Sequence, residues 1–247
     1  MKLAVLYAGP YRGNDTILQN HKLAFGDIDV DVYVSCFKHY LDEWVASGWD
    51  VKEYFITPDV DFNETNWKKS DWPVKEYFIT PDIDFKSTNW YKYRNNEAGQ
   101  SGFWQFWNLK NVIDFVPKKY DYYIKSRNDI VFNHSFTFDI NELKPNTIYS
   151  PTESFHRKDW DENNWINDEF YIGCENTMKV VSNFVTNFYE QNRHNLNVRT
   201  ASNESQLRIW LRENNIDVKK IYNFPYTKNH NGVTIPSGYV GFQLEKI

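Results

Sequence analysis

This chain of 247 residues has little cysteine and no long apolar run. Its two cysteines, Cys36 and Cys174, lie far apart and fit small buried thiols better than a disulfide framework, which indicates a reducing compartment. No stretch approaches the ~20 apolar residues of a membrane-spanning helix. The apolar part of the opening is too short for a secretory signal, because it reads only LAVLYA. We therefore expect a cytoplasmic protein without a transmembrane segment, for which peripheral membrane association stays open.

A basic excess is also missing, and so are several catalytic motifs. The chain has 28 Lys and Arg against 33 Asp and Glu, a net charge of -5, which argues against a general nucleic-acid binder. No G-x-G-x-x-G fingerprint, P-loop or G-x-S-x-G is present, and the six histidines show no zinc-site spacing. Kinase-type, serine-hydrolase and zinc-dependent chemistries therefore have no support in the sequence.

Strand and helix patterns alternate along the chain. Aromatic residues make up 18% and hydrophobic residues 41% of it, enough for a sizeable core. Strands are predicted at 2–7, 29–36, 121–126, 146–150 and 167–173, and helices at 15–25, 95–116, 175–189 and 203–214. The opening strand, helix and strand predict a βαβ unit and a parallel sheet. We expect one α/β domain over residues 1–247, with a Rossmann-like mixed, mostly parallel central sheet flanked by helices, and an irregular tail from Ile221.

A tandem repeat of 23 residues occupies positions 51–90. The two copies read VKEYFITPDVDFNETNW (51–67) and VKEYFITPDIDFKSTNW (74–90), identical at fourteen of seventeen positions. Two copies are too few for a solenoid, which needs about three units. Each copy reads as a strand, a Pro-Asp turn and a polar tail. One copy is expected to fill a regular place in the sheet and the other to be an insertion at its edge; a substrate-facing flap is the alternative.

The segment from Tyr120 to Phe132 places charged residues where an apolar strand ends, since it reads YDYYIKSRNDIVF. Ligands of open α/β sheets bind outside the carboxyl ends of strands. There Asp129 could ligate Mg²⁺ or Mn²⁺ bridging two phosphates, and Arg127 could form a two-pronged contact with a phosphate. The alternative is a salt bridge between Arg127 and Asp129. Solvent exposure is expected for Lys125.

A second candidate segment, GPYRG, directly follows the first predicted strand at 9–13. Gly9 permits close approach of backbone to a ligand. Tyr11 could stack on a base, and Arg12 could contact a diphosphate. An ordinary turn is the alternative interpretation.

A third segment, WINDEF at 165–170, combines aromatic and acidic residues. Either Asp168 or Glu169 could act as a general base beside a sugar-binding platform, because sugar rings stack on aromatic side chains such as Trp165. Glu169 could bind acceptor hydroxyls, although it competes with Asp168 for the role of base. The alternative is a pair of solvated loop acids beside a core tryptophan.

The order of these segments resembles a group of bacterial and viral glycosyltransferases with the GT-A fold, similar to enzymes of lipopolysaccharide and capsule synthesis. Their opening strand and small-Gly-x-x-Arg segment is similar to LAVLYAGPYR, and their second strand to VDVYVSCF. Their Arg-x-Asp strand, which replaces the Asp-x-Asp of other GT-A enzymes, resembles YDYYIKSRNDIVF. Their Asn-Asp-Gln-Phe segment and closing helix resemble INDEFYIGCENTM and NESQLRIWLRENNIDV. The resemblance spans roughly residues 1–218 but does not include the repeat.

The resemblance implies a nucleotide-sugar donor, a divalent cation (Mn²⁺ or Mg²⁺) and transfer to a glycan or other hydroxyl. By position, the donor-binding residues would be Gly9, Tyr11, Arg12, Arg127 and Asp129. Only Asp129 would ligate the metal, because Arg127 stands where Asp-x-Asp has its first carboxylate, and Arg127 could take over part of the cation's charge role. Asp168 would deprotonate the acceptor in an inverting reaction, with Trp165 and Glu169 on the acceptor side.

Two other interpretations remain open. The chain could be a non-catalytic carbohydrate-binding or structural protein that uses its tryptophans and its repeat, or a GT-A-like fold that has lost activity. The βαβ start favours an enzyme over a lectin-like module, because such modules are often all-β jelly rolls.

Overall fold

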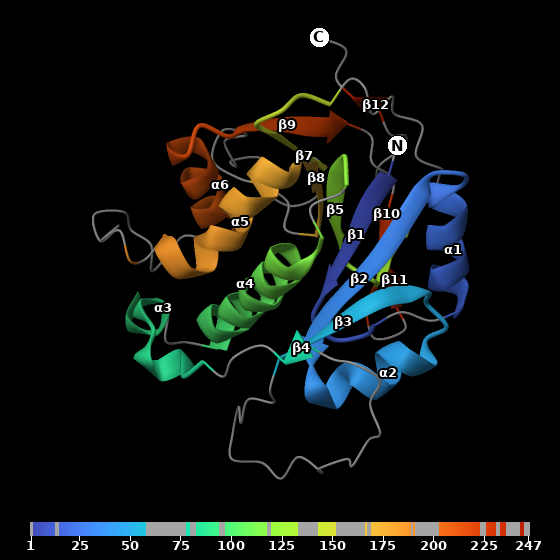
Figure 1. The fold of residues 1–247 in the computed structure, drawn as a ribbon, viewed down its shortest axis with the longest axis horizontal. Coiled ribbons are helices and arrows are strands. Elements are labelled where there is room, and N and C mark those ends of the chain that lie inside the picture. Colours follow the sequence, from blue (N-terminus) through green and yellow to red (C-terminus); the bar gives the residue numbers. More distant parts are fainter. Residues whose placement is uncertain are drawn as a thin grey trace.

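The structure is a computed structural model. It describes residues 2–12, 15–57, 78–79, 83–93, 97–117, 120–132, 143–151, 166, 169–188, 190, 203–222, 226–230, 233–235 and 243–244. Over these ranges the chain forms a nine-stranded mixed sheet covered by helices, beside a smaller three-stranded sheet (Figure 1). The predicted α/β class and the mixed, mostly parallel sheet are confirmed, and the arrangement is compatible with a Rossmann-like fold.

The large sheet has the strand order β12-β9-β7-β8-β5-β1-β2-β3-β4. Its strands are β1 (Lys2–Ala8), β2 (Asp29–Phe37), β3 (Val51–Thr57), β4 (Phe78–Ile79), β5 (Tyr122–Ser126), β7 (Thr147–Pro151), β8 (Phe170–Gly173), β9 (Asp217–Tyr222) and β12 (Gln243–Leu244). The strands from β5 to β4 in this order run parallel, whereas β8 lies antiparallel between β5 and β7. The apolar run LAVLY makes β1 suited to the sheet centre, where both of its faces are buried.

Helices cover the two faces of the large sheet and build a hydrophobic cluster on each (Figure 1). One face carries α3 (Asn89–Tyr93), α4 (Glu97–Phe115), α5 (Glu175–Asn187) and α6 (Asn203–Glu213), and the other carries α1 (Asp15–Phe25) and α2 (Leu41–Ala46). Two short 3-10 helices, η1 (Lys38–Tyr40) and η2 (Phe85–Ser87), lie between these elements along the chain. Among the described helices, none is long and apolar enough to cross a membrane.

The small sheet corrects the prediction of an irregular tail from Ile221. It pairs β6 (Ile130–Phe132) with β10 (Tyr226–His230), and β10 with β11 (Val233–Ile235), both antiparallel. The prediction was wrong because the β10 sequence, YTKNH, shows no apolar alternation. The strand forms because it pairs with β6, about a hundred residues earlier in the chain. The sequence of β10 alone does not predict this long-range pairing.

Some residues of the repeat lie in the large sheet and others in the hydrophobic core. The first copy forms the whole of β3, and the second copy adds β4 at the sheet edge. The two strands are parallel and pair equivalent residues, because Phe55 lies opposite Phe78 and Ile56 opposite Ile79. From the second copy, Phe85 and Trp90 are buried in the cluster that contains α4. Residues 58–77 and 80–82, which include the end of the first copy, lie outside the described residues.

A buried polar contact fixes α4 at the carboxyl ends of β2 and β3. The Asn108 Oδ1 atom accepts hydrogen bonds from Ser35 Oγ at 3.1 Å and from Thr57 Oγ1 at 2.8 Å. Its Nδ2 atom donates to the Trp104 carbonyl at 3.0 Å. Because buried polar groups need partners, these bonds specify one position of the helix along the sheet.

Candidate functional site

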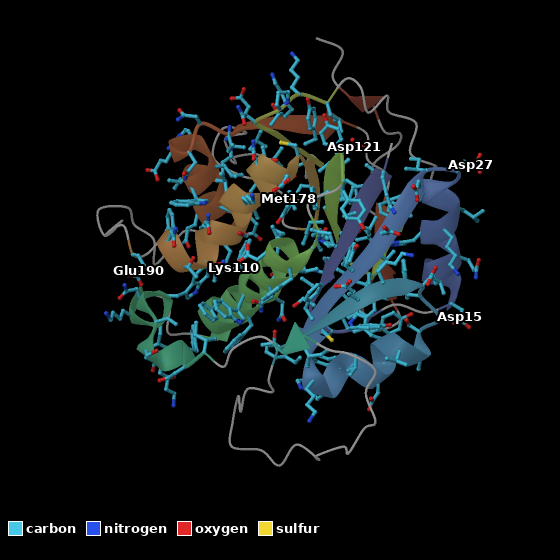
Figure 2. All side chains as sticks on the ribbon, in the orientation of Figure 1. Asp15, Asp27, Lys110, Asp121, Met178 and Glu190 are labelled. Carbon is cyan, nitrogen blue, oxygen red and sulfur yellow. The ribbon has the colours of Figure 1, made fainter. Side chains whose placement is uncertain are left out.

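The sheet topology places two of the predicted segments at one position. From β1 the chain builds β2 and then β3 on one side, and it later returns to form β5 on the other side of β1. The loops that leave β1 and β5 therefore diverge at their carboxyl ends, which is where open α/β sheets bind ligands. Residues 9–12 follow β1 and residues 127–129 follow β5. Asp121, labelled in Figure 2, precedes β5 at its amino end, so these loops lie at the opposite end of that strand.

A third segment reaches the same edge because β8 is antiparallel to β5. Phe170, the first residue of β8, pairs with Ser126, the last residue of β5. Glu169 therefore lies beside Arg127, whose backbone N–H donates to the Glu169 carbonyl at 3.0 Å. We call residues 9–12, 127–129 and 169 the switch-point site.

Asn128, which the sequence analysis missed, joins the loops after β1 and β5. Its buried side chain accepts a hydrogen bond from the Arg12 N–H at 2.7 Å and donates one to the Pro10 carbonyl at 3.0 Å. Asparagine can do both because its amide has an acceptor and two donors. The two loops thus form one unit, although they lie more than a hundred residues apart in the chain.

Gly9 has the backbone geometry that only glycine adopts without strain. Its φ is +103°, in the left-handed half of the conformational map, so any side chain there would be strained. Its N–H donates to the Ser35 carbonyl at 2.8 Å, and its carbonyl accepts from Trp44 Nε1 at 3.0 Å. A Cβ built on Gly9 would meet no described atom within 4 Å, so there is room beside this backbone.

The side chains of Tyr11 and Arg12, in the same loop, differ in exposure. The Tyr11 ring is half-buried and packs against Trp44, with ring centroids 5.1 Å apart and the rings nearly edge to face. Arg12 is exposed. Its positive charge nevertheless acts on the carboxylate of Asp129. Arg12 is therefore available to an anion approaching the loop from solvent.

Arg127 forms a bidentate salt bridge with Asp129. Its Nε donates to Asp129 Oδ1 at 2.7 Å, and an Nη donates to Oδ2 at 2.5 Å. The Asp129 side chain is 1% exposed and that of Arg127 is 26% exposed. Burial favours a higher pKa for Asp129, but the hydrogen bonds and charge of Arg127, with the charge of Arg12, outweigh it and hold the pKa below its usual range. The salt bridge considered as the alternative interpretation is therefore present, and Asp129 is ionised.

A second carboxylate lies on the other side of Arg127. The Glu169 carboxylate lies 3.7 Å from an Arg127 Nη, and its side chain is 4% exposed. The guanidinium of Arg127 thus lies between two buried carboxylates that belong to different strand ends. This position links Glu169 to Arg127 rather than to open solvent.

Lys125 is not solvent-exposed, so that prediction was wrong. Its side chain is 2% exposed, and its Nζ lies 5.7 Å from the centre of the Tyr171 ring, a cation–π arrangement. The reason is that β5 lies between β1 and β8, with both faces of the sheet covered. Lys125 thus packs inside the sheet, on the strand that leads to the site.

Helix α1 holds the strand that directly follows Asp129. Asn20 pairs with the backbone of Phe132, accepting from its N–H at 2.7 Å and donating to its carbonyl at 2.6 Å. The His21 Nε2–H donates to the Ile130 carbonyl at 2.7 Å, and Nδ1 accepts from the Tyr7 hydroxyl at 2.7 Å. Burial lowers the pKa of His21 to about 4 despite the opposing effects of that carbonyl and of Asp129, so the imidazole is neutral near pH 7.

The surroundings of Asp129 disfavour the divalent cation that the resemblance implies there. Both Asp129 oxygens already accept hydrogen bonds from Arg127, so a metal ion there would lie beside the positive charge of the guanidinium. Within the described part of the chain, no group of three or more His, Cys, Asp or Glu side chains is placed to hold a metal. The described residues therefore do not fit a divalent cation on Asp129.

Two of the predicted site residues, Trp165 and Asp168, lie outside the described residues. Their neighbours Ile166 and Glu169 are described, and both are buried. The sequence prediction of a general base at Asp168 and a sugar platform at Trp165 therefore stays a prediction.

A pocket of about 180 Å³ lies away from the switch-point site. It opens between α4 and α5, near Met178, which is labelled in Figure 2. It is lined by Ile113, Asp114, Val116, Tyr123, Glu175, Met178 and Lys179. These residues come from the end of α4, the start of β5 and the start of α5, so the pocket faces the amino end of β5.

Comparison with known proteins adds no relative: no protein-family model matches the chain, and no curated protein matches it. The functional conclusion therefore rests on the residues and geometry of the switch-point site together with the resemblance of the sequence motifs.

Proposed function

We propose that the chain is a nucleotide-sugar-dependent glycosyltransferase of the GT-A type. It would bind the diphosphate of a nucleotide sugar at the switch-point site and transfer the sugar to a hydroxyl of a glycan or other acceptor. The observation that supports this most is the Asn128 contact, which joins the Gly9–Arg12 loop to the Arg127–Asp129 turn where α/β sheets bind ligands. Each of the joined segments contributes a guanidinium.

The proposed reaction requires residues that stabilise the charge of the diphosphate, contact the nucleotide base and deprotonate the acceptor. The leaving nucleoside diphosphate develops negative charge, which nearby positive groups stabilise. Arg12 and Arg127 belong to the two joined loops, and open space beside Gly9 allows the phosphates to approach the backbone. Tyr11, two residues after this glycine, is the candidate to contact the base. A general base must deprotonate the acceptor in an inverting reaction, and Asp168 is the proposed one.

Glu169 has a role of its own in this proposal. Because its carboxylate is buried beside Arg127, we assign it to holding that guanidinium rather than to binding acceptor hydroxyls. Trp165 remains the proposed platform for the acceptor sugar, since aromatic faces stack on sugar rings.

Thermal denaturation with UDP, GDP and dTDP tests this proposal. A nucleotide present at a hundred times its Kd stabilises the fold by about 2.7 kcal/mol. For a chain of this size that free energy raises Tm by roughly 5–10 °C. A shift with glycans but with none of the nucleotides would support the carbohydrate-binding alternative instead.

Substitution of the two aspartates tests the mechanism. Asp168→Ala should abolish transfer while leaving nucleotide binding intact, whereas Asp129→Ala should weaken nucleotide binding. Measurement of donor hydrolysis and sugar transfer, with nucleotide affinity beside it, separates the two effects. Unchanged activity in both variants would show that the assigned roles are wrong.

A further inference from the structure

We propose that Arg127 itself provides the positive charge beside the donor diphosphate, and that donor binding by this chain needs no divalent cation. This inference rests on the proposed function and deepens it, because it assigns the charge that faces the phosphates to a side chain of the protein. Asp129 then acts as a positioning residue for Arg127 and not as a metal ligand.

The fork between Arg127 and Asp129 is the first support. Nε and one Nη reach the two carboxylate oxygens at 2.7 Å and 2.5 Å. A divalent cation on these oxygens would lie beside the guanidinium, and the repulsion between the two positive charges disfavours its binding. Removal of the guanidinium would leave Asp129 almost fully buried without the partner that keeps it ionised.

The second support is the place of Arg127 between two acids. An Nη lies 3.7 Å from the Glu169 carboxylate, and the Arg127 backbone N–H bonds the Glu169 carbonyl at 3.0 Å. A cation bound by Asp129 and Glu169 together would need the position between them, and the guanidinium is already there. Two carboxylates from different segments thus orient one arginine.

The charges at this edge are consistent with an anionic ligand. The two carboxylates of the switch-point site, Asp129 and Glu169, are buried, whereas Arg12 is exposed. The charge of this site that solvent reaches is therefore positive. About a quarter of the Arg127 side chain is exposed. Arginine is suited to phosphate because its planar fork can bond two oxygens at once.

Calorimetric titration of the wild-type protein with UDP, GDP and dTDP, in excess EDTA and in excess Mn²⁺, tests the inference. For the nucleotide that binds, we expect the two Kd values to agree within about threefold, well under the tenfold change that each 1.4 kcal/mol produces. Binding that occurs only with Mn²⁺ would overturn this inference and leave the proposed function standing. Binding of no nucleotide in either condition would overturn both.

Two substitutions at position 127 extend the test. Arg127→Asp gives the turn two carboxylates with the spacing of an Asp-x-Asp motif. Arg127→Asn is its neutral control, because asparagine has nearly the size of aspartate but no charge. Both should weaken nucleotide binding in EDTA by about ten- to a hundredfold, the range expected for a lost charge-assisted hydrogen bond. Excess Mn²⁺ should restore binding to the Arg127→Asp variant only.

Unchanged affinity of the Arg127→Asn variant in EDTA would contradict the inference, because another group would then be supplying the charge. Circular dichroism checks that each variant is folded. Should the Arg127→Asp variant fail to fold, the wild-type titrations and the Arg127→Asn variant still decide the question.

Discussion

Deletion of residues 58–80 should preserve both the fold and the switch-point site, because it leaves one intact copy of the repeat. The deletion joins Thr57 to Pro81 and so recreates the Thr-Pro step found in each copy. The first copy supplies the strand β3, and the second supplies the buried Phe85 and Trp90. The shortened chain would therefore keep β3 from the first copy and the buried Phe85 and Trp90 from the second.

The expected change in stability is small because two effects oppose each other. The deletion removes the pairing of β4 with β3, which extends over two residue pairs and contributes about 1–3 kcal/mol at roughly 1 kcal/mol per hydrogen bond. It also shortens the connection between β3 and Ile83, which lowers the entropy cost of closing that loop by about 2 kcal/mol. After the deletion, the retained part of the second copy continues from β3 instead of from β4. The chain must therefore cross one strand spacing of about 4.8 Å, which fewer than two extended residues can span. The net change should lie within about 2 kcal/mol.

Urea denaturation and nucleotide titration of the shortened protein provide the assay. We expect a free energy of unfolding within about 2 kcal/mol of the full chain and an unchanged nucleotide Kd. Deletion of residues 68–90 is a matched control, since it also removes 23 residues and leaves one copy. Unfolding of both shortened chains would refute the division of the repeat between sheet and core. A stable protein that has lost nucleotide binding would instead support the substrate-facing flap.

Three further predictions concern buried polar groups. Asn128→Ala should weaken nucleotide binding, because it removes the contact between the two loops. Asn108→Ala removes similar hydrogen bonds, worth about 1–3 kcal/mol, and should lower Tm by several degrees while leaving nucleotide affinity unchanged. Equal effects of the two substitutions on binding would argue against the Asn128 contact as the link between the loops. The pKa of His21 is about 4 in the fold and about 6.5 in the unfolded chain, so stability should be lost as pH drops through this window, by up to about 3 kcal/mol at pH 4. The His21→Gln variant should show a weaker pH dependence in denaturant titrations between pH 7 and pH 4, and an unchanged slope would exclude His21 as its source.

Single residues show where sequence reasoning worked and where it stopped. The apolar run in β1 and the helical stripe in α4 are local patterns, and both elements were found within two residues of their ends. The exposure expected of Lys125 was wrong because burial depends on β8, which pairs with β5 from a segment 45 residues later. The β10 strand was missed for the same reason, since its partner β6 lies far away in the chain.

The candidate site was predictable in its parts but not in its connections. Gly9, Arg12, Arg127 and Asp129 were marked because their residue types follow strand ends, where ligands bind. Nothing local indicated that Asn128 would bond the loop after β1, or that Glu169 would flank Arg127. Both contacts depend on the order and direction of the strands, which a single sequence leaves open.

A crystal structure of the chain with UDP, GDP or dTDP, determined with Mn²⁺ present, would test the central claim most directly. The account predicts density for the diphosphate between the Gly9–Arg12 loop and Arg127, with the Arg127–Asp129 fork intact. Nucleotide bound elsewhere, or a Mn²⁺ ion on Asp129 with Arg127 turned away, would contradict it.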